Sequence, residues 1–282
     1  MSATTESPRV QVRPHPRWAA LSRKTATFSR RLSHGLYQRL HPCARTTPVF
    51  IVGCQRSGTT MALRTFELSR HARAFHTGDA GAYEHGMLLP RDSIDRLLAE
   101  SRAVVTVFKP MNQTQRVGSF LEDYPNLRVV WLVRDYRDVV NSCVRKWTNM
   151  REVLGGVIES PQTAGWHGEG ISPRQREVLR CHYRPQMSLE SAYALFWWLR
   201  NSLYFEQQLE ADGRVKLVAY EELVARPQSA FGAVYDFCGC PYETSVTREI
   251  FTSSVGRHAQ PEIEPDIAGL CDELAEQLQA HI

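Results

Sequence analysis

The first residues that could do chemistry lie in the stretch V-F-I-V-G-C-Q-R-S-G-T-T, residues 49–60. An apolar run ends at Gly53, and four residues separate this glycine from Gly58, which is the spacing of a phosphate-binding loop. Backbone N–H groups and the positive end of the following helix would surround an anion there. Arg56 adds a positive charge inside the loop. Three hydroxyl groups add further donors: Ser57, Thr59 and Thr60.

The loop lacks the lysine that follows the second glycine in ATPases and GTPases, because Thr59 stands there. A second apolar run, 128–133, ends in Arg134, where such enzymes would carry the acid that holds magnesium. The two differences indicate an anion that is bound without a metal.

Arg134 and Ser142 form the second group of candidate residues. An arginine at the carboxyl end of a central strand is well placed to bind a phosphate through two hydrogen bonds. Ser142 follows eight residues later, one to two turns into the next helix. A purely structural ion pair of Arg134 with Asp135 or Asp138 is the alternative.

Together, Q-R-S-G-T-T and R-D-Y-R-D-V-V-N-S (134–142) resemble the bacterial, P-loop type of sulfotransferase that uses 3′-phosphoadenosine-5′-phosphosulfate (PAPS). The resemblance continues through V-F-K-P (107–110), V-A-Y-E-E-L-V (218–224) and S-S-V-G-R (253–257), in the family's order over residues 48–257. It implies in-line transfer of the sulfuryl group to an acceptor hydroxyl or amine, without a metal. The product nucleotide would be 3′,5′-adenosine bisphosphate (PAP).

The resemblance also assigns the nucleotide-binding residues. Arg56 to Thr60 would hold the 5′-phosphosulfate, Arg134 and Ser142 the 3′-phosphate, and Tyr220 would lie near the adenine. A late loop would close over the nucleotide. The complete set is Gln55, Arg56, Ser57, Gly58, Thr59, Thr60, Arg134, Ser142, Tyr220, Ser254, Gly256 and Arg257.

Catalysis by such an enzyme requires positive charge at the phosphate oxygen that leaves sulfur. Arg56 and Lys109 are the two groups that the resemblance places there. A solvated lysine at a strand end is the alternative for Lys109.

The resembling family has two common arrangements of the general base. Relatives commonly carry a histidine shortly after the lysine, but Met111 and Asn112 stand here. The other family arrangement, a carboxylate after the first helix, indicates Asp79 first and Glu84 second. Two histidines lie in the same stretch: His76 and His85.

The order of apolar runs predicts an α/β fold with a single domain at residues 46–282 and a central parallel sheet flanked by helices. We expect strands at 48–53, 103–109, 128–133 and 215–219. We expect helices at 58–70, 91–100, 114–123, 135–148, 188–209, 227–238 and 264–280, with 71–90 variable and 150–190 less regular.

Residues 1–45 form a basic, partly helical arm. Residues 1–47 hold nine Arg or Lys against one acid, Glu6, so this segment has charge +8 and the remainder −4 of the overall +4. Apolar residues at three- and four-residue steps predict an amphipathic helix from about 17 to 40. Its apolar side could pack on the body, or it could bind an anionic membrane surface. No nucleic-acid-binding module accompanies it, so we expect no nucleic-acid partner.

The composition of the chain indicates in which compartment of the cell the protein acts. The chain has no apolar run of the length that spans a membrane, and its N-terminus does not read as a secretory signal. Seven scattered cysteines show no disulfide framework. We expect a cytoplasmic protein, with peripheral contact at the inner face of the membrane as a variant.

The acceptor cannot be identified from the sequence, although a small molecule, a saccharide or a lipid such as a glycolipid suits the aromatic residues near the expected site. We expect the acceptor pocket to be lined by residues 71–90 and 150–190. Candidate wall residues are Trp147, Trp166, His167, His182 and Tyr183. A small-molecule or nucleoside kinase and a non-catalytic nucleotide-binding protein remain as alternatives.

Overall fold

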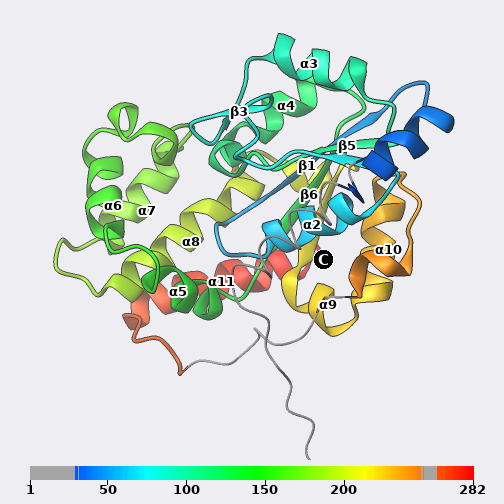
Figure 1. Cartoon of the computed structure of the whole chain (residues 1–282). Helices are drawn as coiled ribbons and strands as arrows, with labels where there is room; N and C mark the ends of the chain where they lie inside the picture. Colours follow the sequence, from blue (N-terminus) through cyan, green and yellow to red (C-terminus); the bar gives the residue numbers. More distant parts are fainter. Residues whose placement is uncertain (1–28, 31, 249, 251–258) are drawn as a thin grey trace, which may run out of the picture.

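The computed structural model describes residues 29–30, 32–248, 250 and 259–282, and Figure 1 shows how the chain runs through them. Within this part, five strands form one parallel sheet in the order β2-β5-β1-β6-β7. Their bounds are β1 (Thr47–Gly53), β2 (Ala72–Ala74), β5 (Val105–Phe108), β6 (Arg128–Val133) and β7 (Val215–Ala219). A small antiparallel hairpin joins β3 (Tyr83–Glu84) to β4 (Met87–Leu88).

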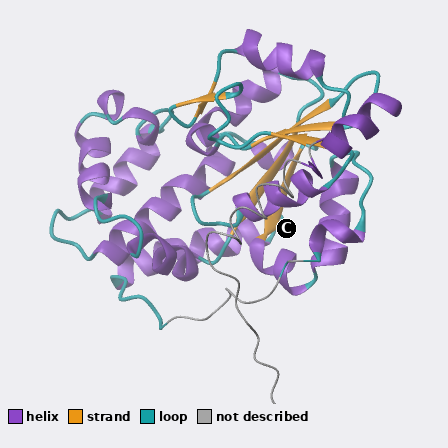
Figure 2. Ribbon diagram, in the orientation of Figure 1, coloured by secondary structure: helices purple, strands orange, loops and turns teal. Residues whose placement is uncertain are grey.

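Helices connect the strands and cover both faces of the sheet, as Figure 2 shows. They are α2 (Thr59–Leu68), α3 (Arg91–Glu100), α4 (Val117–Asp123), α5 (Tyr136–Val144), α6 (Met150–Glu159), α7 (Pro173–His182), α8 (Leu189–Glu206), α9 (Tyr220–Ala225), α10 (Pro227–Phe237) and α11 (Pro265–Gln279). Short 3-10 segments are η1 (Met111–Arg116), η2 (Pro161–Thr163), η3 (Gly165–His167), η4 (Leu209–Ala211) and η5 (Thr244–Thr247). Residues 29–30 and 32–40 are also helical.

The alternation of side chains along each strand divides the core into two layers. On β1, Phe50 and Val52 join an apolar cluster with buried residues of α5, α8 and α11. Val49 and Ile51, which point the opposite way, join a second cluster with α2 and α10. The central strands are therefore buried on both faces, and this is why each reads as an almost continuous apolar run.

These observations confirm the predicted α/β class with a central parallel sheet. Strands 128–133 and 215–219 and helix 91–100 have the predicted bounds, and β1 begins one residue early. Because β1 and β6 are neighbours in the sheet, Gly53 lies opposite Leu132, and the loop after β1 comes to lie beside the residues that follow β6.

The prediction for residues 150–190 was wrong, because α6 and α7 form there. Gly155 and Gly156 lower the helix propensity of α6, yet Leu154 and Val157 are fully buried in the core cluster that includes α8. Tertiary packing therefore decides this segment rather than local propensity. At α7 a capping signal was missed, since Ser172 and Gln175 form a capping box. The variable stretch 71–90 also holds the edge strand β2 and the β3–β4 hairpin.

The helix at residues 29–40 contacts the body mainly through polar and aromatic side chains. Gln38 donates to the carbonyl oxygens of Arg70 (3.0 Å) and Ala72 (3.2 Å), and the Tyr37 ring lies 5.3 Å from the His71 ring. Three leucines of this helix are exposed: Leu32 (60%), Leu36 (59%) and Leu40 (68%). Packing of the apolar side on the body, one of the two expectations, is therefore wrong for these leucines. The part of the expected helix before residue 29 lies outside the described residues.

Candidate functional site

The loop between β1 and α2 has a backbone that only glycine satisfies at its two ends. Gly53 has a φ of +133° and Gly58 a φ of +88°. A Cβ on Gly53 would lie 2.2 Å from the carbonyl oxygen of Leu132, and one on Gly58 would lie 2.3 Å from the Tyr220 ring. The glycine spacing is thus required by the neighbouring strand and by Tyr220. No side chain of a described residue caps α2, so the first N–H groups of this helix are available to an anion.

Two arginines and a serine meet at this loop. Arg56 has a left-handed backbone (φ 72°), and its Nε donates to Ser142 Oγ at 2.7 Å. Arg134 is only 9% exposed and donates to the carbonyl oxygen of Arg56 at 3.4 Å. Its guanidinium carbon lies 4.4 Å from the centre of the Tyr220 ring. The fold therefore brings together four residues that are far apart in the chain.

Arg134 also forms an ion pair with Asp138, which the sequence analysis gave as the alternative to a functional role. Its Nη2 donates to Asp138 at 3.0 Å, from the first turn of α5. Asp135 instead caps α5 by accepting from the N–H groups of Arg137 and Asp138. The ion pair fixes the guanidinium beside the loop, so the structural contact and an anion-binding role are compatible.

Polar atoms in the loop are buried without partners in the described part of the chain. They are the hydroxyl of Ser57 and both amide atoms of Gln55. An unsatisfied buried polar group costs about 1–3 kcal/mol, so these atoms are suited to a polar ligand. Thr59 is buried as well, whereas Thr60 is exposed.

Lys109 reaches the same loop from the end of β5. Its Nζ donates to Thr60 Oγ1 at 2.9 Å, and its backbone N–H donates to the Tyr83 hydroxyl at 2.6 Å. Burial of the ammonium group lowers the pKa of Lys109. The lysine is therefore fixed at the start of α2 and is not a solvated strand end.

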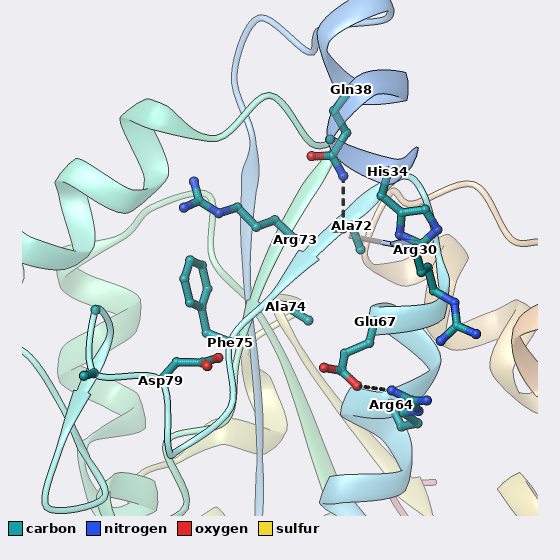
Figure 3. Close-up of a pocket in the computed structure, with 13 residues that line it drawn as sticks. Arg30, His34, Gln38, Arg64, Glu67, Ala72, Arg73, Ala74, Phe75 and Asp79 are labelled. Carbon is teal, nitrogen blue, oxygen red and sulfur yellow. Dashed lines mark hydrogen bonds and ion pairs between the residues drawn. The ribbon is translucent and has the colours of Figure 1, made fainter. Parts of the chain in front are cut away.

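The four residues considered as sources of the general base are not gathered at the loop. The carboxylate of Asp79 accepts from the backbone N–H of His76 at 2.7 Å, and the His76 ring contacts Glu67. Figure 3 shows Asp79 at a cavity of about 470 Å³ beside β2, whose other walls come from α2 and helix 29–40. Glu84 and His85 are exposed on the hairpin. The expectation that Asp79 or Glu84 is the base stays a prediction. The other late candidates, Ser254, Gly256 and Arg257, lie outside the described residues.

Another cavity, of about 290 Å³, is lined in part by Gln55 of the loop. It is lined mainly by aromatic and amide side chains from η1, α5, α6, η3 and α8: Gln55, Asn112, Cys143, Trp147, Asn149, Met150, Val153, Trp166, His167, Tyr193 and Phe196. The hydroxyl of Tyr193 is buried without a partner in the described part of the chain. The structure thus places Trp147, Trp166 and His167 at one cavity, while His182 and Tyr183 are not among its lining residues.

Sequence reasoning missed Tyr193 and Phe196 at this cavity. Both lie on α8, which was expected only as a deeply buried helix, and both are indeed almost fully buried. The signal that could have found them is their spacing of three residues, which places them on one helix face toward η3. Asn149, Met150 and Val153 were missed because α6 was not expected.

Comparison with known proteins gives one family match and several similar structures. The family model for the sulfotransferase domain matches residues 46–257. A sulfotransferase structure from Alicyclobacillus acidocaldarius is 18% identical, with 85% of this chain and 94% of that chain covered and a TM-score of 0.46. Sulfotransferase STF9 from Mycobacterium avium is 13% identical, with coverage of 95% and 86% and a TM-score of 0.45. Mouse sulfotransferase SULT7A1, solved with PAP, is 15% identical, with coverage of 78% and 69% and a TM-score of 0.37.

No curated protein sequence gives a significant match. Among the helices of the described residues, none combines the length and the apolar character needed to cross a membrane. The family match extends over well more than half of the chain, from β1 to the late loop, and includes the phosphate-binding loop, Lys109, Arg134 and Tyr220. The chain therefore belongs to the sulfotransferase domain family.

Proposed function

We propose that this sulfotransferase uses PAPS as the sulfuryl donor and binds it at the loop after β1. The observation that carries the proposal is the meeting of Arg56, Arg134 and Ser142 at a glycine-bounded loop that has no lysine. The hydroxyl of Ser57, buried and without a partner among the described residues, supports it, since it lies where an anion would supply acceptors. Arg56 and the start of α2 would hold the 5′-phosphosulfate, and Arg134 with Ser142 the 3′-phosphate.

The reaction we propose is an in-line displacement at sulfur. Negative charge develops on the 5′-phosphate oxygen as its bond to sulfur breaks, and fixed positive groups at that oxygen lower the barrier. Lys109 and Arg56 would supply these groups, because Lys109 donates to Thr60 at the start of α2 and Arg56, within the loop, is oriented by its bond to Ser142. We assign no step to a metal.

We propose that the acceptor binds in the aromatic cavity beside Gln55. Within the described part of the chain, none of its lining residues is Asp, Glu, Lys or Arg. Aromatic rings can stack on a flat, neutral ring, and the amides of Asn112 and Asn149 can bind hydroxyl groups. This lining favours an uncharged hydroxyl acceptor, either a sugar unit or a phenol.

We also propose that helix 29–40 docks on an anionic membrane surface at its cytoplasmic side, so that the acceptor is part of a lipid or glycolipid. The exposed leucines, Leu32, Leu36 and Leu40, recur every four residues and form one stripe. The sequence around them, residues 29–45, contains arginines and no Asp or Glu. A leucine stripe on a basic helix is the combination that binds anionic headgroups.

Calorimetric binding of PAP and of ATP, each with and without Mg²⁺, tests the nucleotide assignment. We expect PAP to bind tightly in both conditions, because arginines and backbone N–H groups supply the contacts. Magnesium-dependent ATP binding without a PAP signal would instead support a kinase. PAP binding without any sulfuryl transfer would support the non-catalytic alternative.

Vesicle sedimentation tests the membrane assignment. We expect the full chain to bind vesicles of anionic lipid more than neutral vesicles. A triple variant, Leu32→Ser, Leu36→Ser and Leu40→Ser, should lose this binding while its PAP binding is unchanged. Equal binding of the triple variant and the parent chain would contradict the docking proposal.

A further inference from the structure

His167 belongs to the cavity in which the acceptor is proposed to bind. It lies at the end of η3, and the same cavity reaches Gln55 of the phosphate-binding loop and Asn112 of η1. Asn112 stands three residues after Lys109, in the segment where the resembling family commonly carries a histidine. An imidazole thus faces the acceptor cavity from a different element of the fold.

The His167 ring is held by specific contacts. Its plane stacks on the Trp166 ring, with the centroids 3.6 Å apart, and its centroid lies 6.0 Å from that of Phe196. The backbone of Ala164 lies near the ring and favours its protonated form. In a neutral imidazole one nitrogen donates and the other accepts. A neutral His167 therefore has one ring nitrogen that can accept a proton.

The surroundings keep this imidazole neutral. Burial, followed by the positive charge of Arg200, lowers the pKa of His167 to about 4, although the nearby backbone of Ala164 raises it. Arg200 lies on α8, is 1% exposed, and donates to the neutral oxygens of Gln115 and Met111. The nearest acid on the same loop is Glu169, which accepts from Gln115 and Arg116. The other titratable groups at the cavity are the buried Cys143 and Tyr193.

We propose that His167 is the general base that takes the proton from the acceptor hydroxyl. This inference rests on the proposed function of the loop and the cavity. The acceptor oxygen forms a bond to sulfur while the bond from sulfur to the 5′-phosphate oxygen of PAPS breaks. The hydroxyl proton moves to the unoccupied nitrogen of His167, and PAP leaves with the bonding electron pair. His167 returns the proton to solvent when the product departs.

The negative charge of the bound nucleotide would raise the pKa of His167. An opposite charge nearby favours the protonated form of a histidine. The phosphosulfate would therefore raise the basicity of His167 only when the donor is bound. A base with a pKa nearer the operating pH is more effective. Asp79 and Glu84, the earlier candidates, do not line this cavity.

Sulfation of two phenols by His167→Gln tests the proposal. One probe is 4-methylphenol, whose hydroxyl keeps its proton at neutral pH, and the other is pentafluorophenol, which is already ionised. We expect the variant to lose a factor of about 10² or more in kcat/KM with 4-methylphenol. With pentafluorophenol the loss should be less than about threefold, since no proton has to be removed.

Matched variants and PAP calorimetry distinguish the ways in which the proposal for His167 could fail. His182→Gln, at a surface histidine that contacts Asp266, should leave both rates unchanged. An equal loss with both phenols would show that His167 only packs the cavity. A selective loss in Asp79→Asn or Glu84→Gln instead would assign the base there. If the parent chain sulfates neither phenol, the acceptor is not a phenol, and normal PAP binding would show that the donor assignment stands.

A measurement without turnover tests the same residue directly. Nitrogen NMR of ¹⁵N-histidine-labelled protein, with His167→Gln to identify the signal, should show one protonated and one unprotonated ring nitrogen at pH 7. We expect the signal to titrate at a pKa of about 4 in the free protein and at higher pH with PAP bound. An ordinary histidine titration that PAP does not move would overturn the proposal.

Discussion

The phosphate-binding loop and the aromatic cavity beside it share Gln55, yet they are built from different parts. The loop is made of backbone, two glycines without room for a Cβ, and cations held by short hydrogen bonds. The cavity is made of side chains from η1, α5, α6, η3 and α8 and their flanks, mainly aromatic and amide ones. The shape of the loop is set by main-chain geometry, and the shape of the cavity by the volumes of side chains.

This difference predicts how each half responds to change. A charge or donor at the loop acts on the reacting atoms in one geometry, so its removal has a large effect on rate or on nucleotide affinity. An aromatic wall contributes through contact area, which can be reduced in steps. Substitutions at the loop should therefore affect catalysis or PAP binding, and those at the cavity wall, apart from His167, should affect acceptor binding alone.

Lys109→Ala should give the largest effect. The lysine donates to Thr60 at 2.9 Å and is placed to stabilise charge on the leaving oxygen. Loss of one such donor costs about 10²–10³ in kcat. We expect PAP affinity to change by less than about threefold, because the loop N–H groups and Arg134 remain. Single-turnover sulfuryl transfer and PAP calorimetry on the same preparation measure the two effects.

Lys109→Arg and Lys216→Ala serve as controls for this variant. Lys216 lies on β7 near Phe237, so its removal should leave transfer unchanged. Because burial lowers the pKa of Lys109, and the charged form is the useful one, activity should fall as pH rises through that lowered pKa. A guanidinium group at this position would keep its proton, so in Lys109→Arg this alkaline fall should disappear. Persistence of the fall in Lys109→Arg would assign it to another group.

Arg134→Ala should give the second largest effect, on binding rather than on rate. We expect the variant to bind PAP about 10–100-fold more weakly, since a charge-assisted bond to the 3′-phosphate contributes about 1.5–3 kcal/mol. Binding of ADP, which lacks this phosphate, should change much less. The comparison by calorimetry therefore isolates the 3′-phosphate contact.

Arg137→Ala is the matched control, because Arg137 lies three residues after Arg134, on α5, and contacts Asp272 at the surface. Removal of Arg134 also leaves Asp138 without this partner, so thermal unfolding of the variant should be measured first. An equal loss of PAP and ADP affinity would mean that Arg134 only supports the loop.

The sequence predicted the loop half of the site and much less of the cavity. Gly53 and Arg56 could be identified from the spacing of the loop, and Arg134 from its place at the end of a buried strand, whereas Tyr220 came from the family resemblance. The fold then explains the glycines: β6 approaches Gly53, and Tyr220 approaches Gly58. Strands of a parallel sheet are similarly readable, because burial on both faces leaves a continuous apolar run.

The cavity was harder to predict because its parts lie on segments whose form depends on tertiary contacts. Two adjacent glycines obscure α6 in the sequence, and the burial of Met150, Leu154 and Val157 stabilises it as a helix. Tyr193 and Phe196 lie on α8, where every residue from Ser191 to Tyr204 is buried, so burial alone does not distinguish the face that lines a cavity. Aromatic residues could be named as candidates from the sequence, but only the fold shows that they lie at one cavity.

Trp147→Ala should give the smallest of these effects and tests the cavity half. Trp147 follows α5, lines the cavity and is 36% exposed, so its removal opens the mouth without emptying a core. A lost stacking contact of about 0.5–1.5 kcal/mol corresponds to a rise of about two- to tenfold in the acceptor KM. PAP affinity and kcat should stay within about twofold, because Trp147 contacts neither the loop cations nor the leaving oxygen in the proposed arrangement. Trp147→Phe should restore most of the acceptor affinity. A fall in PAP affinity in Trp147→Ala would show that the two halves of the site are coupled through Gln55.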